Sequence, residues 1–138
     1  MGRIKLHLDV IQTVREAVGK DYPIALRLGA CDYIPGGSTL QDSIAAAKEF
    51  EKAGIDLLDI SGGFCGYINP YSKEQGYFSE ITEELKKHIS IPIILTGGIV
   101  DAAAAEKLLL ENKTDLVGVG RAILKNSDWA KNSTFLHQ

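Results

Sequence analysis

The sequence predicts a parallel α/β fold in which four strands alternate with helices along a chain of 138 residues. Strand-like apolar stretches begin near residues 24, 55, 91 and 115, and helical patterns separate them. The last two stretches, IILTGGI and LVGVGRAIL, stop abruptly at glycines. A helix between neighbouring strands carries the chain back to begin the next strand in the same direction, so this alternation requires parallel pairing.

The first part of the chain is expected to hold a helix, a strand and a second helix. Apolar residues at helical spacing predict the first helix, and these are Ile4, Leu8, Ile11, Val14 and Val18. Gly19 follows them, where a left-handed cap is expected. Residues 23–29 indicate a short buried strand. Ser38 and Gln41 resemble a capping box, which predicts the start of a helix that Gly54 closes.

The same alternation continues to the end of the chain. A long loop after the second strand is expected to hold glycines, tyrosines and a proline. The remaining predicted elements are a strand over 55–60, a helix over 79–88, a strand over 91–95, a helix over 101–110, a strand over 115–119 and a short helix over 122–125.

The position of the glycines favours a barrel over an open sheet. A dinucleotide-binding fold has its glycine fingerprint after its first strand, whereas these glycines follow the last two strands. In (β/α)8 barrels, the phosphate site is frequently built from the loops after strands seven and eight and a short extra helix. We therefore expect a fold of the (β/α)8-barrel type and not an open sheet.

Composition excludes several classes of partner. The formal charge is -3, with no basic stripe for nucleic acid and no polybasic segment for a lipid surface. No apolar run approaches the roughly 20 residues of a membrane helix, and a signal-peptide core is missing, so we expect a cytoplasmic protein. Cys31 and Cys65 lie 34 residues apart without a second metal-type pair, so neither a zinc site nor a disulfide scaffold is indicated, and we expect reduced thiols.

Two glycine turns are candidates for binding a phosphate group. Gly97 and Gly98 have no Cβ, so their backbone N–H groups can approach an anion and adopt dihedrals that other residues resist. Gly120 is expected to do the same, and Arg121 adds a guanidinium that can bind phosphate oxygens in bidentate fashion. The alternative is that both glycine pairs are only tight strand-to-helix turns.

Four ordered segments resemble a known family. IALRLGACDY, LLDISGG, IPIILTGGI and DLVGVGRAIL look like the second half of the old yellow enzyme family, the FMN-dependent NAD(P)H:flavin oxidoreductases. The resemblance implies a (β/α)8 barrel with FMN at the carboxyl ends of its strands. It also implies reduction by NADH or NADPH and reoxidation by an activated alkene. By this resemblance the chain holds strands five to eight, so residues 1–138 would form a single partial domain, half of a (β/α)8 barrel that carries the FMN phosphate-binding loops.

The resemblance also implies roles for individual residues. It places Arg27 at the pyrimidine edge of the flavin, where a positive charge stabilises the anionic reduced ring. An ion pair with Asp32 or Asp59 is the alternative explanation for a charge in this strand. The remaining implied cofactor-binding residues are Ser61 and Gly62 along the flavin rim, and Gly97, Gly98, Gly120 and Arg121 at the FMN phosphate.

The family's catalytic side chains are expected outside this chain. In the family, a His paired with Asn or His, together with a proton-donating Tyr, comes from the first half of the barrel, so we expect the isolated chain to be catalytically incomplete. His7, His88 and His137 are expected at the surface. Four tyrosines lie in loops on the catalytic face without an assigned role, namely Tyr33, Tyr67, Tyr71 and Tyr77.

A half barrel is expected to associate. Its outer strands have unpaired edges and its inner face is open to water, which favours a homodimer or pairing with an N-terminal half. The functional alternatives are part of an FMN-dependent oxidoreductase, and a non-catalytic half barrel that binds phosphate, flavin or only itself. A third is another phosphate-binding barrel of the sugar-phosphate isomerase or thiazole synthase type. Such enzymes are expected to use a Lys or Glu at a strand end, and no strand here ends in one.

Overall fold

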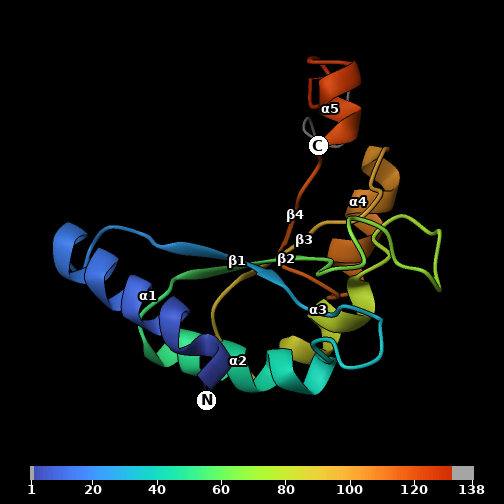
Figure 1. Cartoon of the computed structure of the whole chain (residues 1–138). Coiled ribbons are helices and arrows are strands. Elements are labelled where there is room, and N and C mark those ends of the chain that lie inside the picture. Colours follow the sequence, from blue (N-terminus) through green and yellow to red (C-terminus); the bar gives the residue numbers. More distant parts are fainter. Residues whose placement is uncertain (1, 132–138) are drawn as a thin grey trace.

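In a computed structural model that describes residues 2–131, four parallel strands form one sheet in the order β1-β2-β3-β4 (Figure 1). Each strand pairs in parallel with the next one along the chain, as the alternation with helices predicts. The strands are shorter than the apolar stretches that predict them. They are β1 (Ala25–Gly29), β2 (Leu57–Ser61), β3 (Ile93–Leu95) and β4 (Leu116–Val117).

A helix precedes β1 and follows every strand, so the predicted element order is confirmed. After a short 3-10 turn at Gly2–Ile4, the helices are α1 (Lys5–Val18), α2 (Leu40–Lys52), α3 (Ser79–Leu85), α4 (Ala102–Leu110) and α5 (Arg121–Lys125). Helix α5 projects away from the sheet in Figure 1. None of the helices within residues 2–131 is long and apolar enough to cross a membrane.

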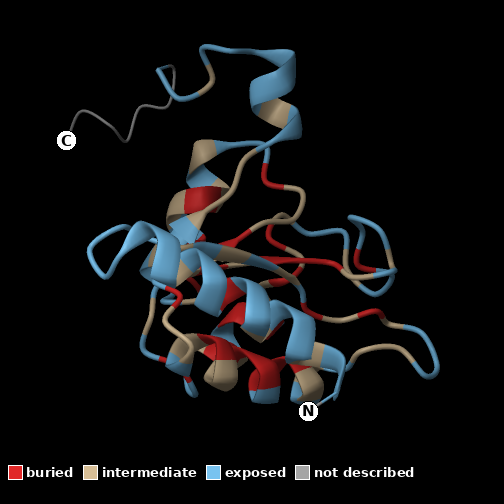
Figure 2. Ribbon diagram, turned by 60° about the vertical axis from the view of Figure 1, so that its left-hand side comes forward, coloured by how far each residue is buried: buried red, intermediate tan, exposed pale blue. Residues whose placement is uncertain are grey.

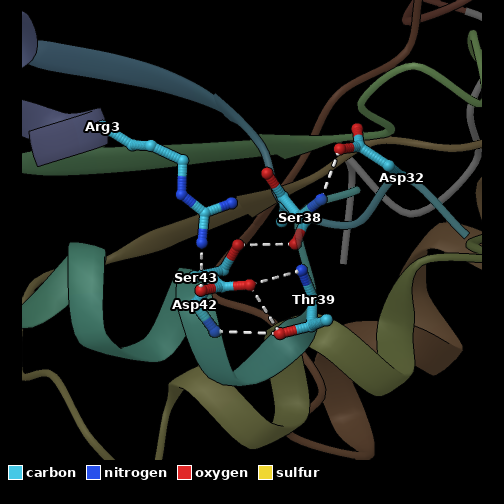
Figure 3. Close-up of polar contacts among 7 residues, drawn as sticks. Arg3, Asp32, Ser38, Thr39, Asp42 and Ser43 are labelled. Carbon is cyan, nitrogen blue, oxygen red and sulfur yellow. Dashed lines mark hydrogen bonds and ion pairs between the residues drawn. The ribbon is translucent and has the colours of Figure 1, made fainter. Parts of the chain in front are cut away.

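Helix α2 begins one residue later than its sequence signal suggests. The N-cap is Thr39, whose hydroxyl accepts from the N–H of Asp42, while the Asp42 carboxylate accepts from the Thr39 N–H at 3.0 Å (Figure 3). The predicted capping box of Ser38 and Gln41 is therefore wrong. The N–H of Ser38 instead donates to the Asp32 carboxylate at 2.5 Å, which fixes Ser38 in the preceding loop.

One face of the sheet is covered by helices and forms the core. Leu58, Ile60, Ile93 and Leu95 are fully buried on this face. Their partners in the core come from α2, α3 and α4, and include Ile44, Ala47, Phe50, Ile81, Leu85 and Leu108. Figure 2 shows these buried residues gathered on the strands and on one side of α2. Full burial of one such large side chain contributes about 1.5–3 kcal/mol, so this face holds the fold together.

Helix α1 is only partly buried. Ile11 is the buried residue of its predicted apolar stripe, whereas the side chains of Val14 and Val18 are 38% and 40% exposed. Polar contacts fix its C-terminal end, because the Arg15 guanidinium donates to the Gly54 carbonyl at 2.6 Å. Gly19 ends the helix, as predicted, at a positive φ of 81°, but its ψ of 179° is extended and differs from that of the expected left-handed cap.

The other face of the sheet is not covered by these helices. Successive side chains of a strand point to opposite faces, so the residues between the core positions share this open face. Arg27 of β1 is in register with Asp59 of β2, which is in register with Ile94 of β3. The row they form borders the cavity described below.

Candidate functional site

A cavity of about 580 Å³ lies at the carboxyl ends of the strands. Parallel strands end at the same edge of a sheet, so the loops that follow them converge there. Six of the seven cofactor-binding residues predicted from the sequence line this cavity, and they are Arg27, Ser61, Gly97, Gly98, Gly120 and Arg121. The structure thus brings together positions that are up to 94 residues apart in the chain (from 27 to 121).

Gly62, the seventh predicted residue, lies outside the lining of the cavity. It is buried in the loop after β2. A Cβ at this position would lie 2.6 Å from the Gly66 carbonyl oxygen and 2.8 Å from Cζ of Phe78. Close packing within the protein therefore accounts for glycine at this position.

Arg27 and Asp59 form an ion pair on the open face of the sheet. Nε of Arg27 lies 2.9 Å from Oδ2 of Asp59, and their side chains are 59% and 22% exposed. Of the two ion-pair partners considered for Arg27, Asp59 is the one in contact. Burial raises the pKa of Asp59 above its ordinary value, and the charge of Arg27 opposes that rise. Because Arg27 is more than half exposed, it avoids the cost of an unpaired buried charge.

Asp32 binds two backbone N–H groups and does not pair with Arg27. Its two carboxylate oxygens accept from the backbone N–H groups of Ser38 and Phe64, at 2.5 and 2.6 Å. These bonds hold the pKa of Asp32 below its ordinary value although burial acts in the opposite direction. Asp32 therefore joins the loop after β1 to the loop after β2. Its negative charge is stabilised by the two backbone N–H groups that it accepts from.

The loop between β3 and α4 contains two glycines in the left-handed region. Gly97 has a φ of 128° and Gly98 a φ of 69°, which confirms that this turn needs dihedrals that other residues resist. The Tyr77 ring packs against both, since a Cβ on Gly97 or Gly98 would lie 2.9 or 2.6 Å from a ring carbon. Within residues 2–131, no group accepts a hydrogen bond from the N–H of either glycine.

In the loop between β4 and α5, the backbone conformation does not require a glycine. Gly120 has a φ of -111°, which any residue can adopt, and a Cβ there would meet open space. No group in the described part of the chain accepts from its N–H. Arg121 follows as the first residue of α5, with an exposed side chain. Neither backbone strain nor crowding by other residues in the range 2–131 accounts for glycine at position 120.

Gln75 and Tyr77 contribute to this region without a role assigned from the sequence, although the sequence predicts Tyr77 on the catalytic face. Gln75 and Tyr77 belong to the long loop after β2, which crosses the start of α4. The Gln75 side-chain oxygen accepts from the N–H groups of Val100 and Asp101, at 2.6 and 3.1 Å. The Gly76 N–H donates to the Gly97 carbonyl at 2.6 Å. This segment fastens the loop after β2 to the glycine turn after β3.

Of the other candidate side chains, Tyr67 lines the cavity, whereas the cysteines, His7, His88 and Tyr33 do not. Cys31 and Cys65 are free thiols, and no group of His, Cys, Asp and Glu suited to a metal ion occurs within residues 2–131. His7 and His88 are exposed, as expected, and His137 lies outside the described residues. The Tyr33 hydroxyl donates to Glu80 at 3.0 Å, and burial raises the pKa of this phenol.

The fold and the site together define a class of protein, a parallel α/β chain of the barrel type with a cavity at the carboxyl ends of its strands. Residues 2–134 match the family described as the NADH:flavin oxidoreductase / NADH oxidase family, and the chain belongs to that family. Members of this family are FMN-dependent oxidoreductases that use NAD(P)H.

Curated relatives agree with this membership. The chain is 36% identical over 135 residues to an NADH oxidase of Thermoanaerobacter brockii, a match that covers 95% of this chain and 21% of the relative. It is 33% identical over 133 residues to an NADPH dehydrogenase of Listeria welshimeri, covering 96% of this chain and 38% of the relative. The chain therefore spans less than two fifths of the length of these relatives.

Solved structures confirm the fold class. A 2-naphthoyl-CoA reductase complex superposes with a TM-score of 0.84 at 27% identity, covering 95% of this chain and 21% of that one. Histamine dehydrogenase from Rhizobium sp. 4-9 gives a TM-score of 0.79 at 19% identity, covering 94% and 19%, which supports the fold alone. Four parallel strands alternating with helices, as half of a (β/α)8 barrel, is thus the fold of this chain.

Proposed function

We propose that this chain is the FMN-binding part of an NAD(P)H-dependent flavin oxidoreductase that reduces activated alkenes. One observation carries the proposal. The free N–H groups of Gly97, Gly98 and Gly120 and the Arg121 side chain belong to residues that line one cavity. Backbone N–H donors beside a guanidinium are the groups that bind a phosphate monoester. Helix α5 has only five residues, so we assign the binding to these donors and not to a helix dipole.

The residues present fit the phosphate of FMN. Gly120 leaves open space where any other residue would place a Cβ, so an anion can approach its N–H closely. Arg121 uses an N–H group for Tyr77, at 3.1 Å, and its other donors are available for phosphate oxygens. Gly97 and Gly98 supply backbone donors from the neighbouring loop.

Arg27 and Ser61 fit the ring portion of the cofactor. Arg27 brings a positive charge to the open face of the sheet, which would stabilise negative charge on the pyrimidine edge of a flavin. Ser61 is buried and lines the same cavity. When bound, FMN supplies the hydride chemistry, with NADH or NADPH as reductant and a small activated alkene as oxidant.

We assign no catalytic residue of this chain to the alkene. Within residues 2–131, no histidine lines the cavity at the strand ends. The tyrosines at this cavity, Tyr67 and Tyr77, are joined to each other by the bond from the Tyr77 hydroxyl to the Tyr67 carbonyl. We therefore propose that substrate-polarising groups come from outside this chain, in an N-terminal half, and that the chain alone is inactive.

Visible absorption across the gel-filtration peak tests the proposal, after incubation with FMN or with riboflavin. Flavin that travels with the protein, and FMN bound more tightly than riboflavin, supports a phosphate site. Arg121→Gln should weaken FMN binding by about tenfold or more, since a hydrogen bond to a charged group contributes about 1.5–3 kcal/mol. Arg3→Gln is the control, because Arg3 pairs with Asp42 and does not line the cavity at the strand ends. Equal affinity for both flavins would contradict the proposal.

A second candidate function is self-association without catalysis. Strand β1 pairs only with β2 among the described residues, so its outer edge is free to accept another strand. Pairing with a second copy or with an N-terminal half would cover that edge and the open face of the sheet. Light scattering over a range of concentrations measures this directly. A mass that stays at the 15.0 kDa of one chain would contradict it.

A further inference from the structure

Tyr77 lies where three segments of the cavity meet. It belongs to the loop after β2, its ring packs on Gly97 and Gly98 after β3, and its hydroxyl meets Arg121 after β4. Of the tyrosines in the described part of the chain, it is the one whose hydroxyl contacts a predicted phosphate-binding side chain. This position suits a residue that sets the geometry of the site.

The hydrogen bonds of the Tyr77 hydroxyl have a fixed direction. A phenol has one proton to donate, and this proton goes to the backbone carbonyl of Tyr67. Its oxygen therefore presents lone pairs to Arg121, whose terminal nitrogen donates to it at 3.1 Å. Because the proton is already committed, the phenol oxygen acts as an acceptor that holds the guanidinium.

The backbone of Tyr77 is anchored independently of Arg121. Its N–H donates to the Gly97 carbonyl at 3.3 Å, and its carbonyl accepts from the Asn69 side chain at 2.6 Å. Asn69 is buried, so this bond lies in the interior of the loop. The Tyr77 ring also packs edge-on against Phe78, with centroids 4.8 Å apart. The ring is thus held in place from several sides.

Arg121 has no comparable support of its own. Its side chain is exposed, and α5 has no buried residue within its five positions. A free arginine side chain of this length samples many rotamers, and ordering it opposes ligand binding. A hydrogen bond from a fixed partner reduces that cost in advance.

We propose that Tyr77 is a positioning residue of a phosphomonoester site. Its hydroxyl holds the Arg121 guanidinium beside the N–H groups of Gly97 and Gly98, and its ring covers that glycine turn. This inference rests on the proposed function, because it takes the FMN phosphate as the occupant. It adds a residue that acts through Arg121 and belongs to neither predicted phosphate loop.

Tyr77→Phe tests this role, because it removes the hydroxyl and keeps the ring against the glycines. The dissociation constants of FMN and of riboflavin, which lacks the phosphate, are measured by flavin fluorescence. We expect FMN to bind about tenfold more weakly and riboflavin to bind unchanged. Tyr71→Phe is the matched control, since Tyr71 is 82% exposed and does not line the cavity. Circular dichroism checks that each variant is folded.

A double-mutant cycle separates positioning from a merely structural role. If Tyr77 acts through Arg121, then Tyr77→Phe has no further effect on FMN affinity in an Arg121→Gln background. Additive losses in the two variants would overturn the inference. An equal loss of FMN and riboflavin binding in folded Tyr77→Phe would also overturn it, because the effect would not be specific to phosphate.

The same measurements distinguish two failures. Wild-type protein that binds FMN no better than riboflavin removes the phosphate site, and the proposed function fails with it. Wild-type protein that prefers FMN, with a Tyr77→Phe variant that keeps the full preference, removes only the role of Tyr77. Inorganic phosphate that competes with FMN less effectively in Tyr77→Phe than in wild type supports the inference.

Discussion

The two faces of the sheet carry different kinds of side chain, although their residues alternate along the same strands. Ile93 and Ile94 are neighbours of identical type, yet Ile93 is fully buried under the helices and Ile94 borders the open cavity. On the covered face, apolar packing supplies stability. On the open face, the ion pair of Arg27 and Asp59 supplies charge. In this chain, stability and candidate ligand chemistry are thus separated by the pleat of the sheet.

The largest effect should come from breaking the covered face. Ile93→Ala should lower the free energy of unfolding by about 2–5 kcal/mol, because it removes buried methyl groups and leaves a cavity. Ile94→Ala is the matched control on the open face and should cost well under half as much. Urea denaturation of both variants measures the difference. Equal losses would show that the open face is also packed in solution.

Glycine substitutions should separate stability from binding. Gly98→Ala should destabilise the fold by about 1–3 kcal/mol, because its left-handed backbone and the Tyr77 ring both oppose a Cβ. Gly120→Ala should leave stability within about 0.5 kcal/mol, since its backbone is ordinary and the space is open. FMN affinity should nevertheless fall in Gly120→Ala. An unchanged affinity would remove Gly120 from the phosphate site.

The smallest effect concerns the charge on the open face. The pKa of Asp59 is raised in the folded state, so the folded chain holds more protons between the ordinary and the raised pKa. Its contribution to stability therefore falls as pH rises through that window. Arg27→Ala removes the opposing charge, so we expect the pKa of Asp59 to rise further. The loss of stability with rising pH should then be larger and should continue to higher pH. Carboxyl NMR titration of both proteins measures the shift, and an unchanged pKa would contradict it.

The same variant also tests the proposed cofactor. Loss of the positive charge at position 27 should weaken flavin binding and lower the reduction potential of bound flavin. Lys48→Ala serves as the control for loss of a positive charge, because Lys48 does not line the cavity at the strand ends. An unchanged potential in Arg27→Ala would remove Arg27 from the flavin edge.

Local sequence patterns predicted the elements and their order, because apolar periodicity and glycine positions act over short distances. They were less accurate at boundaries. Thr39 and not Ser38 caps α2, since a bond from Ser38 to Asp32, six residues earlier in the same loop, fixes the residue before the helix. Val14 and Val18 follow the helical pattern but are not buried. Such details depend on contacts between segments that a local pattern does not contain.

Residues of the candidate site could be predicted from the sequence where their residue type has few structural roles. Glycines and an arginine at strand ends indicated an anion site, and the six residues that line the cavity came from that reasoning or from the family resemblance. Tyr77 was not assigned because its place depends on the path of the whole loop after β2. Gly62 was placed on the flavin rim by the family resemblance, whereas crowding against the Gly66 carbonyl and Phe78 accounts for a glycine at this position.

The pairing between strands becomes shorter along the chain. Five registered residue pairs join β1 to β2, three join β2 to β3, and two join β3 to β4. Both glycine loops follow β3 and β4, the two neighbouring strands that are joined to each other by the fewest pairs. We therefore expect the sheet to unfold locally at β4 first. An anion bound by both loops would stabilise that end of the sheet. Amide hydrogen exchange should then slow most at β3 and β4 when phosphate is added, and least at β1.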